Sequence, residues 1–178
     1  MDKPMPKIMF MGQCLMIKCR DIFRPREIIL GEVDIKPGSK VLDFGCGPGS
    51  YIIHVSKTIG ESWKVYALDI HPLAIEKVKS IASKLGLANV ETICSDCATG
   101  LPDKEIDTVL LYDIFHMFND KRKVLSELHR VLRDDGILSF SDHHMKEKNI
   151  ISEMKEINLF ELRKKNKRTY SFAKILRA

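Results

Sequence analysis

The ten residues Val41-Leu42-Asp43-Phe44-Gly45-Cys46-Gly47-Pro48-Gly49-Ser50 largely determine which architecture we expect for this chain. Residues 41–44 are mostly apolar and predict a short buried strand, and a helical pattern begins at Tyr51. Three glycines at alternate positions lie between them, and glycine lets a backbone approach a ligand closely at positive φ. A strand, a glycine loop and a helix start therefore predict a site where backbone N–H groups hold a nucleotide-like ligand.

The glycine spacing distinguishes two kinds of nucleotide-like ligand. A dinucleotide fingerprint requires G-x-G-x-x-G, whereas this loop has G-x-G-x-G, with Ser50 where the last glycine would fall. Asp43 would also repel the phosphates of a dinucleotide. An acid at this position suits a ligand that carries an amine and a sulfonium, so a dinucleotide-dependent oxidoreductase is the less favoured alternative.

Strands and helices alternate after the glycine loop. Apolar runs predict strands at 64–68, 90–94, 108–112 and 137–141, the last one entered through a turn at 134–136. Helical spacing predicts one helix opened by Pro72 and ended by Gly86, and another that begins at about Asp120. Repeated alternation of this kind predicts right-handed crossovers and a doubly wound parallel sheet.

The C-terminal part breaks this alternation. A helix with Ile150, Met154 and Ile157 on one face precedes two expected strands, at 160–163 and 169–175, which a hairpin joins. The hairpin makes the last strand antiparallel. The expected fold class is therefore α/β: a doubly wound, mostly parallel seven-stranded sheet that ends in an antiparallel hairpin.

Together these features resemble the class I S-adenosylmethionine-dependent methyltransferases, which have a Rossmann-like fold and a sheet that ends in such a hairpin. The glycine loop resembles the first motif of that family, and the resemblance covers about residues 24–178. It implies that 24–178 form a methyltransferase domain of the small-molecule type, which transfers a methyl group from S-adenosylmethionine by in-line displacement. Residues 1–23 then form an N-terminal lid, while core packing and a homodimer contact stay open as alternatives for this segment.

The resemblance also implies a set of cofactor contacts. Asp43 lies near the methionine amine, Asp69 accepts hydrogen bonds from the two ribose hydroxyls, and Asp96 accepts from the adenine amine. The implied cofactor-binding residues are Asp43, Phe44, Gly45, Cys46, Gly47, Gly49, Asp69, Ile70, Asp96, Cys97 and Tyr112. Without the resemblance, Asp69 could be a helix N-terminal acid, and Asp96 could start an Asx-turn.

Candidate catalytic residues follow the expected strands at their carboxyl ends, where open α/β sheets bind ligands. They are Asp113 and His116 after the fourth strand, and Asp142, His143 and His144 after the fifth; the four preferred ones are Asp113, His116, His143 and His144. Histidine has a pKa suited to a general base near neutral pH, so the His143-His144 pair is preferred. The alternative is that these are ordinary solvated loop residues, because positioning alone can accelerate methyl transfer.

Composition and charge limit the choice of partners. The chain has 178 residues, a net charge of +5 and five cysteines, whose odd number and irregular spacing predict reduced thiols in the cytoplasm. Cys94 and Cys97 form C-x-x-C, but the two further ligands of a tetrahedral zinc site are missing, so no metal is expected. The apolar stretch near the N-terminus is too short to span a bilayer, and no membrane partner is expected.

The acceptor is expected to be a small molecule. Residues 112–115 lack the Asn/Asp-Pro-Pro-aromatic motif of the enzymes that methylate exocyclic amines, and no aromatic–basic repeat indicates a nucleic-acid module. Two alternatives stay open. One is an RNA methyltransferase that uses the basic segment 146–178, and the other is a cofactor-binding subunit that is not catalytic on its own.

Overall fold

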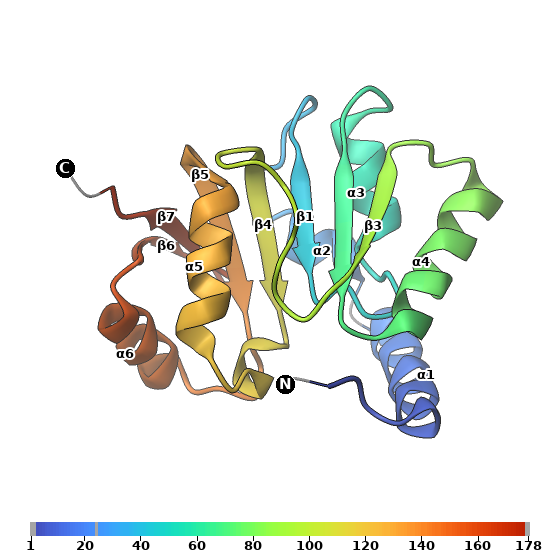
Figure 1. Ribbon diagram of the computed structural model, residues 1–178, viewed down its shortest axis with the longest axis horizontal. Helices are drawn as coiled ribbons and strands as arrows, with labels where there is room; N and C mark the ends of the chain where they lie inside the picture. Colours follow the sequence, from blue (N-terminus) through green and yellow to red (C-terminus); the bar gives the residue numbers. More distant parts are fainter. Residues whose placement is uncertain (1–2, 24, 177–178) are drawn as a thin grey trace.

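The computed structural model describes residues 3–23 and 25–176, and its core is one mixed β-sheet (Figure 1). The strands are β1 (Val41–Phe44), β2 (Val65–Asp69), β3 (Val90–Cys94), β4 (Ile106–Tyr112), β5 (Leu132–Ser141), β6 (Phe160–Lys165) and β7 (Tyr170–Lys174). They lie in the order β3-β2-β1-β4-β5-β7-β6. Strands β1 to β5 pair in parallel, and β7 pairs antiparallel with both β5 and β6. The predicted seven-stranded sheet with its terminal antiparallel hairpin is confirmed.

Helices cover both faces of this sheet. They are α1 (Lys7–Phe23), α2 (Arg26–Leu30), α3 (Ile52–Ile59), α4 (Pro72–Leu85), α5 (Lys121–Val131) and α6 (Glu147–Ile157), together with the 3-10 helix η1 (Phe115–Met117). Side chains of α5 and α6 form one apolar layer with Leu42 and Phe44 of β1, while α2, α3 and α4 form the other with Val41. Burial on both sides explains why a nearly continuous apolar run, rather than an alternating one, marks this central strand.

Local signals set the helix ends near the site. Pro72 stands in the first turn of α4, and Gly86 ends that helix in a left-handed conformation, with φ 64°. His71 caps the same helix, because its Nδ1 accepts a hydrogen bond from the backbone N–H two residues on, over 3.2 Å. Asp120 caps α5 in the same manner from its carboxylate, over 2.8 Å. Both predicted boundaries of α4 and the predicted start of α5 are therefore confirmed.

The start of the fifth strand differs from the prediction. Strand β5 begins at Leu132, so the predicted turn at 134–136 lies inside the strand, beside a register shift in its pairing with β4. Gly136 is required there because an added Cβ would lie 2.8 Å from the Leu132 side chain and 3.0 Å from the Asp107 carbonyl oxygen. The chain stays in the sheet through this register shift, which the turn-forming sequence Asp-Asp-Gly does not reveal.

The carboxyl ends of the parallel strands meet at the lower edge of the sheet in Figure 1. Helix α1 lies at this edge beside α4, and its Phe10 and Cys14 pack against Ala74 of α4. The N-terminal segment is thus folded against the part of the sheet where a ligand is expected. Arg24, the first residue of the predicted methyltransferase domain, lies outside the described residues.

Candidate active site

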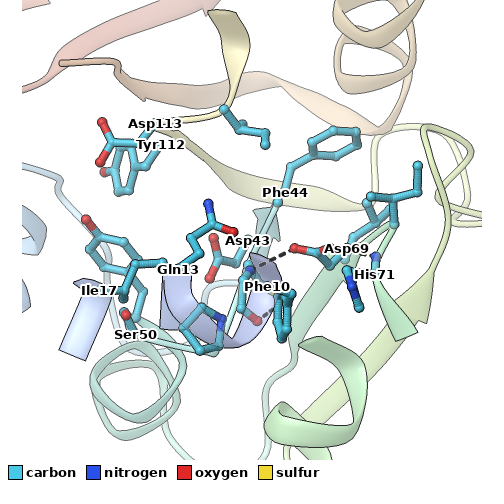
Figure 2. A pocket seen from close by; sticks show the side chains of 18 of the residues that line it. Phe10, Gln13, Ile17, Asp43, Phe44, Ser50, Asp69, His71, Tyr112 and Asp113 are labelled. Carbon is cyan, nitrogen blue, oxygen red and sulfur yellow. Dashed lines mark hydrogen bonds between the residues drawn. The ribbon is translucent and has the colours of Figure 1, made fainter. Parts of the chain in front are cut away.

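A cavity of about 410 Å³ lies between the lower sheet edge and α1. Its walls come from the ends of β1, β2 and β4, the loops after β3 and β5, and α1. Figure 2 shows Asp43, Asp69 and Tyr112 on the sheet side, with Phe10 and Gln13 of α1 also bordering the cavity. Residues far apart in the sequence therefore converge on one partly open cavity.

The glycine loop contributes backbone to the cavity wall. Gly45, Gly47 and Gly49 all have positive φ, at 80°, 51° and 86°. At Gly47 an added Cβ would meet no atom within 4 Å, whereas at Gly45 it would lie 3.2 Å from the Ile114 side chain. The loop therefore permits close approach of a ligand at Gly47, and it requires glycine at Gly45 for packing.

Asp69 ends β2, and two backbone donors hold its carboxylate. Oδ2 accepts from the Gly47 N–H over 2.9 Å, and Oδ1 accepts from the His71 N–H over 2.8 Å. Burial raises the pKa of Asp69, and these two hydrogen bonds oppose the rise. Each carboxylate oxygen keeps a further lone pair. The side chain therefore fixes the glycine loop and can also accept from two neighbouring hydroxyls of a ligand.

Asp43 is the most deeply buried acid of the cavity wall, with 2% of its surface exposed. Among the residues that the structure describes, its Oδ2 alone is a buried side-chain oxygen without a hydrogen-bond partner. Burial, with a smaller contribution from the charge of Asp69, raises the pKa of Asp43 to about 7. A buried carboxylate is costly unless it is paired, so this oxygen is suited to a cationic group of a ligand.

Two histidine–carboxylate pairs lie at the ends of β4 and β5. His143 Nδ1 lies 2.7 Å from Asp113 Oδ1, and His116 Nδ1 lies 2.9 Å from Asp142 Oδ2. The ring of His144 contacts both other imidazoles, with centroid distances of 3.9 Å to His143 and 4.3 Å to His116. A carboxylate at Nδ1 favours the neutral tautomer whose Nε2 is unprotonated. The Nε2 atom of His143, at the cavity wall, can therefore accept a proton.

Helix α1 is attached over the cavity near both of its ends. Arg20 forms an ion pair with Asp113 over 3.1 Å, between groups that are partly exposed. Phe10 stacks on His71 with the ring centroids 4.1 Å apart, and His71 Nε2 lies 3.1 Å from the Met5 carbonyl oxygen. Because His71 Nδ1 already accepts from the backbone of α4, Nε2 carries the proton and donates to Met5.

Most predicted site residues border the cavity: Asp43, Phe44, Gly45, Cys46, Gly47, Asp69, Ile70, Asp96, Tyr112, Asp113, His143 and His144. Gly49, Cys97 and His116 do not line it, and a contact of these three with a ligand stays a prediction. Gly49 faces α4, where an added Cβ would lie 3.1 Å from Val78. Cys97 is buried in the apolar layer that contains α5. His116 contacts the cavity-lining His144 through its ring and shares the carboxylate of Asp142 with the backbone of that residue.

Several residues that line the cavity were not predicted from the sequence: Gln13, Arg20, His71, Ser95, Ile114 and Phe118. His71 had a usable signal, because it directly precedes the helix-opening Pro72 and follows Asp69 by two positions. Arg20 had none, since its partner Asp113 lies 93 residues further along the chain. The sequence did not indicate Gln13 either, because the side of α1 that borders the cavity is set by the packing of that helix on the domain.

Strand order, glycine loop and cavity together define a Rossmann-like methyltransferase domain. The sequence profile of the family described as "Methyltransferase domain" matches residues 35–174, so the chain belongs to this family. The recognition of a class I methyltransferase is confirmed, and the cofactor of the class is S-adenosylmethionine. Within the described ranges, no group of three or more His, Cys, Asp or Glu side chains could hold a metal ion.

Individual relatives differ in what their names say they methylate. A protein-L-isoaspartate O-methyltransferase of Methanococcus maripaludis is 33% identical over 111 residues, or 62% of this chain and 50% of that protein. A demethylmenaquinone methyltransferase of Bacillus mycoides is 35% identical over 106 residues, or 58% of this chain and 44% of that protein. A solved structure of a SAM-dependent methyltransferase from Aquifex aeolicus has a TM-score of 0.75 at 27% identity, over 85% of this chain and 90% of that one. The chain spans about half the length of the curated relatives it matches.

Proposed function

We propose that this chain transfers a methyl group from S-adenosylmethionine to a small-molecule acceptor inside the cavity, with His143 as the general base. One juxtaposition carries the proposal: the unpartnered carboxylate oxygen of Asp43 and the Asp113-bound imidazole of His143 border the same cavity. The first group suits a cationic cofactor. The second suits removal of a proton from an acceptor.

The cofactor side lies at the ends of β1, β2 and β3. Asp43 Oδ2 fits the amine of the methionine part, and the open space at Gly47 admits that part close to the backbone. We expect Asp69 to accept hydrogen bonds from the ribose hydroxyls, and Asp96, whose Oδ2 lies 3.5 Å from Lys123 Nζ, to border the adenine. When bound, S-adenosylmethionine supplies an electrophilic methyl group whose leaving group is a neutral thioether.

The acceptor side lies at the ends of β4 and β5. Asp113 accepts from His143 at both the ring Nδ1, over 2.7 Å, and the backbone N–H, over 3.2 Å. Two contacts from one carboxylate fix the direction of the imidazole, so His143 Nε2 can take the proton of an O–H or N–H group as that group gains the methyl. The Asp113 carboxylate then stabilises the imidazolium.

The cover over the cavity favours a small acceptor over RNA, because α1 closes one side of it. The volume of about 410 Å³ is that of a small-ligand pocket, which suits the cofactor. In the basic C-terminal segment, Arg163 pairs with Glu161 and Lys165 pairs with Glu147. Part of the charge that an RNA would use is therefore already neutralised. A cytoplasmic location and a homodimer stay predictions.

Mass-spectrometric detection of S-adenosylhomocysteine tests this proposal. The chain is incubated with S-adenosylmethionine and, in separate reactions, with the small-molecule, protein and RNA fractions of a cell extract. We expect the demethylated product only with the small-molecule fraction. Product formed only with protein or RNA would overturn the small-molecule acceptor. Cofactor binding without turnover in any fraction would overturn the enzymatic proposal in favour of a subunit that is not catalytic alone.

A further inference from the structure

The side of α1 that faces away from the domain is apolar along its whole length. Its large side chains have exposed fractions between 57% and 83%. We call this set the outward face of α1; it consists of Ile8, Met9, Met11, Leu15, Met16, Ile22 and Phe23. In a helix these positions fall on one broad side, because residues three, four and seven apart lie on the same face.

This face is not explained by the packing of the domain. Helix α1 already docks through its opposite side, where Phe10 and Cys14 are buried against α4. A contiguous exposed apolar surface of this kind is uncommon on a monomeric protein and marks a contact with a protein or a membrane. In Figure 1, α1 lies at the rim of the molecule, so its outward face is accessible.

Charge on α1 decides between these two occupants. Lys7 and Lys18 are exposed and lie eleven residues apart, about three helical turns, so they share one flank of the outward face. The single acid of α1, Asp21, is occupied by ion pairs with Arg20 and Arg26, over 3.1 and 3.0 Å. An isologous contact through this face would place four lysines beside one interface, two from each copy, while Asp21, the acid of α1, is already paired. An anionic surface would be complementary to them.

We propose that α1 docks on the surface of an anionic lipid bilayer through its outward face, with Lys7 and Lys18 at the headgroups. Apolar side chains on one face with lysines beside them are the features of helices that lie in the membrane interface. No helix among the described residues is long and apolar enough to cross a membrane, so this contact lies along the bilayer. This proposal departs from the sequence-based expectation of no membrane partner, which rested on the length of the apolar segment.

One residue connects this face with the active site. Met16 belongs to the outward face, with 68% of its surface exposed, and it also borders the cavity. Docking through α1 therefore places that part of the cavity wall next to the lipid. The docking proposal does not depend on the identity of the methyl acceptor.

Flotation with vesicles tests the proposal. The full chain is mixed with vesicles of phosphatidylcholine alone, or of phosphatidylcholine with phosphatidylglycerol. We expect it to float with the anionic vesicles and to be released from them as the salt concentration rises. Each of Lys7→Gln and Lys18→Gln should weaken the partition about fivefold, because a basic residue near an anionic surface contributes about 1 kcal/mol.

A second set of variants distinguishes binding through the outward face of α1 from non-specific adsorption of exposed apolar side chains to the vesicles. Ile8→Gln, Leu15→Gln and Ile22→Gln combined should abolish flotation, and none of these residues borders the cavity. Leu85→Gln and Leu162→Gln combined, at exposed apolar positions on other elements, should leave flotation unchanged. Equal binding to both vesicle types would overturn the proposal. It would also be overturned if the chain did not float and light scattering showed a dimer that the triple variant dissociates.

Discussion

The Nδ1 atom of His143 lies 2.7 Å from Oδ1 of Asp113, a contact that joins the loop after β5 to the end of β4 at the cavity wall. Oδ2 of the same carboxylate accepts from Arg20 of α1 over 3.1 Å. One side chain therefore orients the proposed base and also attaches the helix that covers the cavity. In the proposed mechanism, the position of the base and the attachment of α1 would therefore depend on the same carboxylate.

Removal of the proposed base should lower turnover far more than binding. His143→Ala should reduce kcat about 100- to 10,000-fold for an acceptor that loses a proton, with little change in cofactor affinity. Asp113→Asn should reduce kcat by less, because the imidazole stays but its tautomer is no longer fixed. Steady-state kinetics with the acceptor found by the extract assay measure both effects.

The matched control for this variant is His54→Ala. His54 Nδ1 also lies near a carboxylate, that of Glu27 at 3.3 Å, but outside the cavity. It should leave kcat unchanged. If His143→Ala and His54→Ala had the same activity, His143 would not be the base.

The pKa of Asp43, about 7, predicts how cofactor affinity depends on pH. Below that pH the free protein holds a proton on Asp43, which must leave before the carboxylate can pair with the amine of a ligand. The Kd of S-adenosylhomocysteine should therefore rise about tenfold for each pH unit below 7 and level off above it. Isothermal titration calorimetry between pH 5 and pH 8 measures this slope.

Asp43→Asn supplies the control and a stability prediction. In that variant affinity should be weaker and nearly independent of pH, and an unchanged slope would remove Asp43 from the binding site.

The raised pKa also means that the folded protein holds more protons than the unfolded chain between pH 3.8 and about 7. The contribution of Asp43 to stability therefore falls as pH rises through this window, and Asp43→Asn should abolish that fall.

Alanine at Gly47 should separate ligand binding from backbone strain. Gly47 and Gly86 have φ 51° and 64°, and at both an added Cβ would meet no atom within 4 Å. Each alanine variant should lose about 1 kcal/mol of stability, from the left-handed conformation. Only Gly47→Ala should also lose affinity for S-adenosylhomocysteine, because its methyl group enters the cavity. Equal affinities in the two variants would contradict close approach at Gly47.

The Arg20–Asp113 ion pair should slow escape of a bound ligand. Arg20→Met removes it, and the dissociation rate of S-adenosylhomocysteine should rise up to about fivefold, the value of a partly exposed pair. Stopped-flow displacement measures the rate. Lys36→Met breaks the exposed pair of Lys36 with Asp34, outside the cavity, and should leave the rate unchanged. A rate unaffected by Arg20→Met would show that this contact does not hold α1 closed.

The sequence predicted those site residues whose position follows from the strand pattern. Asp43, Asp69 and Tyr112 lie at or near the carboxyl ends of strands, and parallel pairing brings such ends to one edge. Gly49 and Cys97, for which the same reasoning predicted a place beside the ligand, do not line the cavity. A glycine that admits a helix side chain looks the same in sequence as one that admits a ligand, and Cys97 turns from the loop into the core.

Helix α1 could not be placed from the sequence for a different reason. Its outward face is as apolar as the side that docks, so periodicity does not tell which residues are buried. Phe10 and Cys14 are buried while Met11 and Leu15, one position further on, are exposed. Only the contact of α1 with α4 and His71 selects the face, and that contact brings Gln13 and Arg20 to the cavity.

Thermal unfolding with separate ligands tests the cavity as the S-adenosylmethionine site most directly. A ligand present at 100 times its Kd stabilises the protein by about 2.7 kcal/mol, which raises Tm by about 5–10 °C for a chain of this size. We predict this rise with S-adenosylmethionine and with S-adenosylhomocysteine, and none with NAD. A rise with NAD alone, or no rise with either sulfur ligand, would contradict the assignment of the glycine loop, Asp43 and Asp69 to this cofactor.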